Sequence, residues 1–162
     1  MRENSSDTPG VIVFPPLIPL LILILGIVLN LAAPLDLLKQ VPLLVRIVVG
    51  TIAFMVGVAM VIAATRNFRQ VGTNVNPLQP TLVLATAGIF RWTRNPMYLG
   101  GSIVLLGIAI GGALDWVLLL LILSLPLVHY GIILREENYL ARKFGEEYRS
   151  YQKQVARYWW RF

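Results

Sequence analysis

Long apolar runs without charged side chains alternate with short polar segments along this chain. Residues 11–33 form a 23-residue run without a charge, and a second apolar run lies within residues 41–64. Residues 97–134 form a third run of 38 residues, whose single formal charge is Asp115. A helix of about 20 apolar residues is long enough to cross the hydrocarbon core of a bilayer. The pattern therefore predicts membrane-spanning helices.

The third apolar run is too long for one span. A straight helix of that length would measure about 57 Å, against a hydrocarbon core of about 30 Å. We therefore expect it to fold back at Gly111, Gly112 and Asp115. The prediction is an all-α polytopic membrane protein, a single domain over residues 1–162, with spans at about residues 11–33, 43–64, 96–111 and 116–134. Gly50 and Gly57 in the second span predict a face that packs closely on a neighbouring helix.

The polar segments carry two further elements. Residues 65–95 form a long connection, which is typical of functional or disordered loops; its apolar and aromatic side chains favour an ordered interfacial loop. In the tail, residues 135–162, apolar side chains recur at spacings of four, four, three and four, which predicts an amphipathic interfacial helix. Gly145 interrupts this stripe and predicts a kink or a break between two short helices. The stripe consists of Leu140, Phe144, Tyr148, Tyr151 and Val155.

The distribution of charged residues indicates which kind of partner the protein binds and how it is oriented in the membrane. The net charge is +6 and the isoelectric point about 10.1, but the basic residues lie beside apolar runs. We therefore expect membrane lipids, not nucleic acid, as the partner. With four spans, twelve of the fourteen Lys and Arg residues share a side with the termini and the long loop. The positive-inside rule places that side in the cytoplasm. The chain has no Cys and one His, which argues against a metal site.

The stretch from Arg94 to Gly100 lies where the polar loop meets the third apolar run. Asn95 is a good N-cap residue, and Pro96 suits the first helical position. Free N–H groups at a helix start attract carboxylates and phosphates, and Arg94 adds a fixed cation. Gly100 leaves room for a close approach to the backbone.

Two carboxylates, Glu136 and Glu137, begin the tail on the same side of the membrane. Adjacent helical residues point about 100° apart, so only one of them faces a common pocket with Arg94. We expect the other to pair with Arg135 or a loop arginine. Such a pocket suits a ligand with hydroxyls or an amine at one end and a carboxylate or phosphate at the other. S-adenosylmethionine and a dinucleotide both fit, and the residues alone leave both open.

The order of motifs resembles the superfamily of isoprenylcysteine carboxyl methyltransferases and phospholipid methyltransferases. The likeness lies in an Arg94-Asn95-Pro96-x-Tyr98-x-Gly100 motif, in Glu136-Glu137 and in a Phe-Gly-x-x-Tyr-x-x-Tyr pattern beginning at Phe144. It covers about residues 73–155. Asn95 stands where many members have His.

The resemblance implies S-adenosylmethionine bound at the cytoplasmic face and methyl transfer to a lipid-like or prenylated substrate. The residues that it assigns to the cofactor are Arg94, Asn95, Pro96, Tyr98, Gly100, Glu136 and Glu137. A carboxylate or thiolate acceptor needs only a cation to hold it, and Arg91 or Arg94 can serve. An amine also needs a base, for which a Glu or His129 is the candidate.

The sequence shows no dedicated acid–base pair, which favours an acceptor that is already ionised. Two other readings remain: a nicotinamide-dependent membrane reductase of the steroid-reductase kind, and a non-enzymatic four-helix membrane protein. The acceptor and the oligomeric state are not determined by the sequence.

Overall fold

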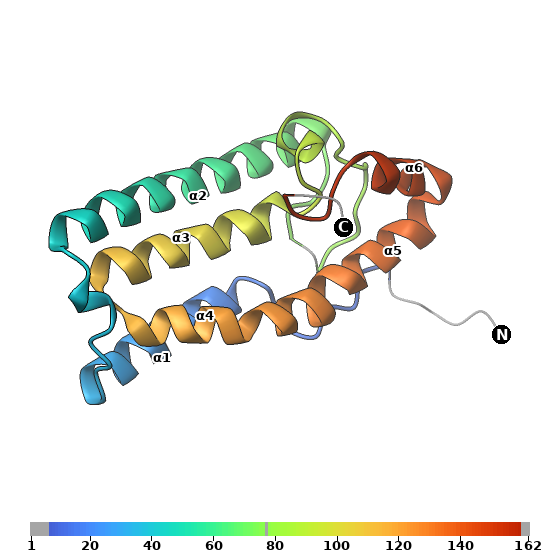
Figure 1. Ribbon diagram of the computed structural model, residues 1–162. Helices are drawn as coiled ribbons and strands as arrows, with labels where there is room; N and C mark the ends of the chain where they lie inside the picture. The colour runs from blue at the N-terminus through green and yellow to red at the C-terminus, as the bar shows by residue number, and fades with distance from the viewer. Residues whose placement is uncertain (1–6, 77, 160–162) are drawn as a thin grey trace. The chain divides into compact units, whose positions relative to one another are not determined.

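The computed structural model describes residues 7–76 and 78–159, and within them the chain is all-helical, without a β-strand (Figure 1). The end of the predicted tail, residues 160–162, lies outside this range. The α-helices are α1 (Leu17–Ala32), α2 (Leu43–Val71), α3 (Pro96–Gly112), α4 (Asp115–Val128), α5 (Leu134–Phe144) and α6 (Glu146–Gln154). Three short elements complete the described secondary structure: 3-10 helices η1 (Leu38–Gln40) and η2 (Gly88–Arg91), and a π-helix η3 (His129–Ile133).

The chain divides into two compact units. We call Pro16–Val61 with Met97–Pro126 the helical unit. The polar unit consists of the chain up to Pro15, Ile62–Pro96 and the chain from Leu127 onward. Each unit is described separately below, and the expectation of a single domain stays a prediction.

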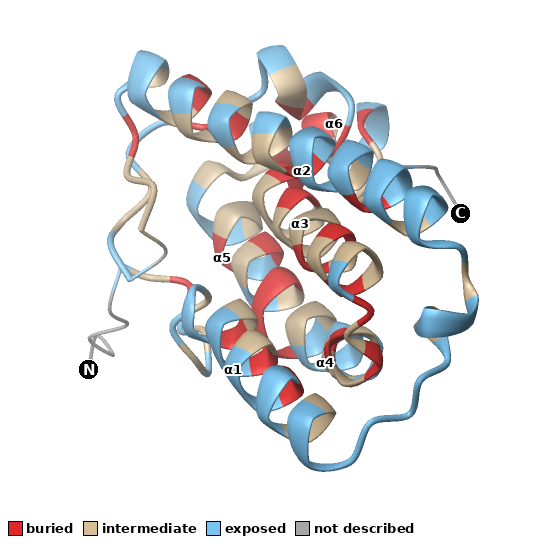
Figure 2. Ribbon diagram, turned by 90° about the vertical axis from the view of Figure 1, so that its left-hand side faces the viewer, coloured by how far each residue is buried: buried red, intermediate tan, exposed pale blue. Residues whose placement is uncertain are grey.

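Two helical stretches are long and apolar enough to cross a membrane, Leu43–Val71 and Asp115–Phe144. In their most apolar 18 residues, only 17% and 28% of the residues are buried by protein. Figure 2 shows the corresponding exposed surface along α2. Leu17–Ala32 and Pro96–Gly112 are shorter apolar helices. These features are typical of a membrane protein, while the number of spans stays a prediction.

Glycines let α2 and α3 approach closely within the helical unit. A Cβ on Gly57 would lie 2.6 Å from the carbonyl oxygen of Gly100, and one on Gly50 would lie 2.8 Å from that of Gly107. Backbone therefore packs directly on backbone, as small residues allow between membrane helices. The predicted close-packing face on α2 is confirmed, and Figure 1 shows these two helices side by side.

Asp115 organises the connection between α1 and α2. Its carboxylate is buried at the first turn of α4 and accepts hydrogen bonds from the backbone N–H groups of Leu37 (3.1 Å) and Leu38 (2.9 Å). Its position at the start of α4 also suits the positive end of the helix dipole. The third apolar run reverses where the sequence predicts, between the end of α3 at Gly112 and the start of α4.

In the polar unit, α2 continues seven residues past the predicted end of the span at residue 64. It ends in a Schellman motif, in which Gly72 (φ +73°) donates to Arg69 O and Thr73 donates to Phe68 O. The expectation that the following loop is an ordered interfacial loop stays a prediction. The Thr73 hydroxyl accepts from the N–H groups of Leu82 and Val83.

An N-terminal strap, residues 7–14, lies along one face of η3 and α5. Ile12 N–H donates to Gly131 O, and Arg135 donates to Gly10 O. Asp7 accepts from the Tyr139 hydroxyl and from the Lys143 ammonium. Gly131, Arg135, Tyr139 and Lys143 recur every fourth residue, so they form one stripe of the helix. Hydrogen bonds from Lys143 and Tyr139 hold the pKa of Asp7 below its usual value.

The tail breaks at Gly145, which has φ +55° between the end of α5 and the start of α6. A positive φ is a conformation that Gly adopts without strain. The predicted break between two short helices is therefore confirmed. Tyr148, Tyr151 and Val155 of the predicted stripe are buried.

Adding a methyl group at Gly107 tests the packing of α2 on α3. A Cβ there would lie 2.6 Å from both Gly50 O and Phe54 N, so we expect Gly107→Ala to lower stability by about 1–3 kcal/mol. Gly101 is the matched control on the same helix, because its Cβ would meet nothing within 4 Å. Thermal unfolding in detergent should show a lower Tm for Gly107→Ala alone. Equal Tm values for the two variants would contradict this packing.

Candidate functional site

The carboxylate of Glu137 lies at the centre of a buried ion cluster in the polar unit. Arg157 binds it with two parallel hydrogen bonds, from Nε at 3.0 Å and from a terminal nitrogen at 2.7 Å. Arg94 adds a salt bridge of 3.2 Å to Oε1. Only 7% of the Glu137 side chain and 9% of the Arg94 side chain are exposed. We call these three side chains the Glu137 cluster.

Burial makes this cluster sensitive to the loss of any member. Water solvates the buried Glu137 charge little, so the charge depends on its two guanidinium partners. The two-pronged contact from Arg157 also fixes the orientation of the carboxylate. Within the described residues, Arg94 Nε is a buried donor without a hydrogen-bond partner. The cluster therefore holds one N–H group and one net positive charge available to an anion.

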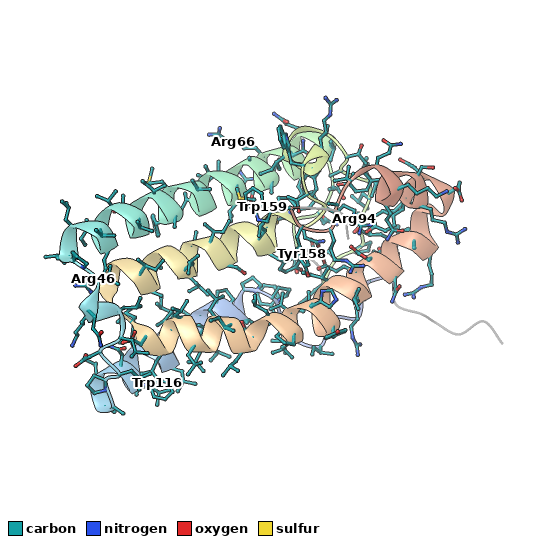
Figure 3. The ribbon with its side chains drawn as sticks, in the orientation of Figure 1. Arg46, Arg66, Arg94, Trp116, Tyr158 and Trp159 are labelled. Carbon is teal, nitrogen blue, oxygen red and sulfur yellow. The ribbon has the colours of Figure 1, made fainter. Side chains whose placement is uncertain are left out.

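Hydrogen bonds to backbone carbonyl groups join the segment before α3 to the segment after α6. Arg94 N–H donates to Ala156 O at 3.0 Å, and the Thr93 hydroxyl donates to Arg157 O at 3.0 Å. The side-chain amide of Asn95 donates to the same Arg157 carbonyl at 3.2 Å. Arg94 and Arg157 therefore contact Glu137 from two chain segments that are hydrogen-bonded to each other. Figure 3 labels Arg94 in this part of the polar unit.

Two buried tyrosines of α6 also contribute to the packing of the polar unit. The Tyr151 hydroxyl donates to Phe90 O at 2.6 Å, and the side chain of Tyr148 is fully buried. Burial raises the pKa of both phenols, and the nearby charge of Glu137 raises each further. Both phenols are therefore neutral donors at physiological pH, and we assign them to packing.

A second polar pair joins η3 to Tyr158, the tail residue that follows Arg157. Nδ1 of His129, the first residue of η3, lies 2.7 Å from the hydroxyl of Tyr158. Tyr130 packs edge-on against the imidazole with ring centroids 4.7 Å apart. The structure thus supplies a His–Tyr pair where sequence reasoning found no acid–base pair.

The other predicted site residues fall in different places. Arg91 is exposed at the end of η2, and the described salt bridges of Glu137 come from Arg94 and Arg157 instead. Pro96 is fully buried as the first residue of α3. Tyr98 and Gly100 follow on α3 in the helical unit, where Gly100 faces the backbone of α2.

Of the two adjacent carboxylates, Glu137 is the one paired with a loop arginine, as the helical geometry predicted for one of them. Glu136 is more exposed, at an intermediate level. Sequence reasoning missed Arg157 and Tyr158. The available signal was weak: both follow directly after the buried stripe ends at Val155, a position at which a chain leaves a helix and can turn back. Within the described residues, no group of three or more His, Asp and Glu side chains could hold a metal ion.

A family model described as phospholipid methyltransferase matches residues 45–147. The chain belongs to this family. Membership confirms the superfamily of membrane methyltransferases that the motifs suggested. Comparisons with curated proteins and with solved structures gave no match.

The match to the phospholipid methyltransferase family covers most of α2, all of α3 to α5 and the first two residues of α6. It includes Arg94, Glu137 and His129, but ends before Arg157 and Tyr158. The partners that fix Glu137 and His129 from the tail therefore lie outside the matched segment.

Glu137→Gln tests the role of the cluster in stability. The change removes the shared counter-ion of the buried Arg94 guanidinium and of Arg157, whose side chain is 33% exposed. We therefore expect a loss of up to about 3–5 kcal/mol, the cost of breaking a buried pair. Glu146→Gln is the matched control, because the Glu146 carboxylate is 70% exposed with salt bridges of 3.7 Å and 3.9 Å. Exposed pairs of this kind contribute about 0–1 kcal/mol. Thermal unfolding should separate the two variants, and similar Tm values would contradict a buried cluster.

Proposed function

We propose that the protein is an S-adenosylmethionine-dependent methyltransferase that modifies a lipid-like substrate at the cytoplasmic membrane face. Family membership supports the reaction class, and the apolar surfaces of α2 and α4 support a substrate that arrives from the bilayer. The observation on which the proposal rests most is the Glu137 cluster, because it fixes Arg94 directly before the start of α3.

The residues present suit the cofactor. Its carboxylate matches the unpartnered Nε of Arg94, which directly precedes Asn95 and the start of α3 at Pro96. Glu136 is the better candidate for the cofactor's amine or hydroxyl groups, because it is partly exposed, whereas Glu137 is buried. In this assignment Glu137 is a positioning residue. The resemblance alone assigns Tyr98 and Gly100.

The protein's part in the reaction is mainly alignment. When bound, S-adenosylmethionine supplies an electrophilic methyl group, and in-line displacement requires the acceptor to be held directly behind it. Arg91 is exposed and remains available for a phosphate or carboxylate of the substrate. Arg94 is held by Glu137, and we assign it to the cofactor.

Ligand-dependent melting tests the cofactor. We expect S-adenosylmethionine or its demethylated product, but not a reduced nicotinamide, to raise the Tm of the purified protein by mass action. Glu136→Gln should weaken cofactor affinity by about 1–3 kcal/mol, the value of a charged hydrogen bond. Glu147→Gln, an exposed carboxylate on α6, is the control and should bind normally. Stabilisation by the nicotinamide alone would favour the reductase reading instead.

The absence of natural Cys residues makes the topology testable with single cysteines. Leu78→Cys in the loop and Lys153→Cys on α6 occupy exposed positions of the polar unit, and we expect impermeant reagents to label them only from the cytoplasm. Leu37→Cys, exposed between α1 and α2, should react only from the other side. Labelling of positions 78 and 37 from the same side would contradict four spans and the proposed cytoplasmic site.

A further inference from the structure

Arg66 and Arg69 lie in the last two turns of α2. Both residues are exposed, and Figure 3 shows the side chain of Arg66 pointing outward from the helix. Within residues 7–76 and 78–159, neither guanidinium has a salt bridge or a hydrogen bond. The proposed cofactor site does not use this pair.

An exposed stripe of α2 ends in these two arginines. Positions seven residues apart fall on one face of a helix. At this spacing the stripe consists of Val48, Met55, Ile62 and Arg69, and Arg66 follows Ile62 by one turn. The three apolar residues are 46%, 60% and 44% exposed. Val48 and Met55 each lie two residues before a glycine that packs on α3, so the stripe is on the opposite side of the helix.

The length of the apolar stripe matches the thickness of a bilayer core. From Leu44, one turn before Val48, to Ile62 the helix rises about 27 Å, and the hydrocarbon core is about 30 Å thick. The turns that follow carry Arg66 and Arg69. A bilayer that covers the apolar stripe therefore places both guanidinium groups at the level of the lipid headgroups.

No carboxylate close in the sequence offsets these two charges, because residues 37–114 contain no Asp or Glu. On α6, by contrast, Arg149 has Glu146 three residues earlier, at 3.7 Å. Arg66 and Arg69 have the same spacing, which makes them neighbours on the helix surface, and like charges there repel. An anion from outside the chain would relieve this repulsion.

The C-terminus of α2 does not occupy the two side chains. Basic side chains near a helix end can bind its last carbonyl groups. Here the carbonyl groups of Phe68 and Arg69 accept instead from the N–H groups of Thr73 and Gly72. Both guanidinium groups therefore keep their donors for a ligand.

We propose that Arg66 and Arg69 together bind the phosphate of an anionic phospholipid, such as phosphatidylglycerol, whose acyl chains lie along the apolar stripe of α2. Guanidinium groups bind phosphate oxygens through charge-assisted, two-pronged hydrogen bonds. A zwitterionic headgroup also carries a phosphate, but its own cation offsets the negative charge that the two arginines attract. The site holds a lipid without reacting with it, so it depends neither on the cofactor nor on the proposed reaction.

Native mass spectrometry of the detergent-purified protein tests this site. Titrations with phosphatidylglycerol and with phosphatidylcholine of the same acyl chains give the affinity for each lipid. Each arginine near a membrane surface accounts for about a fivefold change in affinity for an anionic lipid. We therefore expect the double variant Arg66→Gln with Arg69→Gln to lose the preference for phosphatidylglycerol. Its Tm should equal that of the wild type, because both positions are exposed and Gln suits a helix as well as Arg does.

The matched control removes the same charge from other exposed positions. Arg142→Gln with Arg149→Gln, on α5 and α6, should keep the wild-type preference for phosphatidylglycerol. Equal losses in the two double variants would mean that positive charge in general attracts the lipid, and would overturn the site. An unchanged preference after replacement of Arg66 and Arg69 would overturn it as well.

A competition experiment separates a lipid from a soluble anion. Glycerophosphoglycerol is the headgroup of phosphatidylglycerol without acyl chains. We expect it not to compete with phosphatidylglycerol at equal concentration, because it has nothing to lie along the apolar stripe. Equal competition would assign the arginine pair to a soluble phosphate ligand and would overturn the lipid site.

Discussion

The cost of burying the Glu137 carboxylate governs the polar unit. A charge that is removed from water must be paired and hydrogen-bonded, and a single arginine leaves part of that requirement unmet. Here one guanidinium comes from the segment before α3 and the other from the segment after α6. Because both are needed, these two segments are held against α5 and against each other. The hydrogen bonds from Arg94 N–H to Ala156 O and from the Thr93 hydroxyl to Arg157 O join the same two segments.

The opposite face of α5, the helix that carries Glu137, binds the N-terminal strap. The stripe from Gly131 to Lys143 binds the N-terminal strap, and with a rotation of about 100° per residue Glu137 points away from it. The strap contacts therefore do not compete with Arg94 and Arg157 for the same surface. Both ends of the described chain are fastened to one helix, each by a charged group that meets an opposite charge.

Sequence patterns predicted the features that repeat or that break a repeat. The glycines of α2, the reversal before Asp115 and the break at Gly145 all follow from local chemistry, and the structure has them. The α2 helix was predicted too short because the apolar pattern ends at residue 64, whereas the backbone stays helical until Gly72 allows a positive φ. Arg157 and Tyr158 were missed because a pairing between residues 20 or 29 positions apart leaves no periodic signal.

The position of Arg157 in the chain sets an order of assembly during synthesis. All of α1 to α5 leaves the ribosome before Arg157 does, so until then Glu137 has Arg94 as its only partner in the cluster. A chain stopped after α6 would still carry every apolar helix needed for insertion into a bilayer. It would lack the guanidinium that completes the cluster, so the Glu137 cluster depends on a part of the chain that the apolar helices do not include.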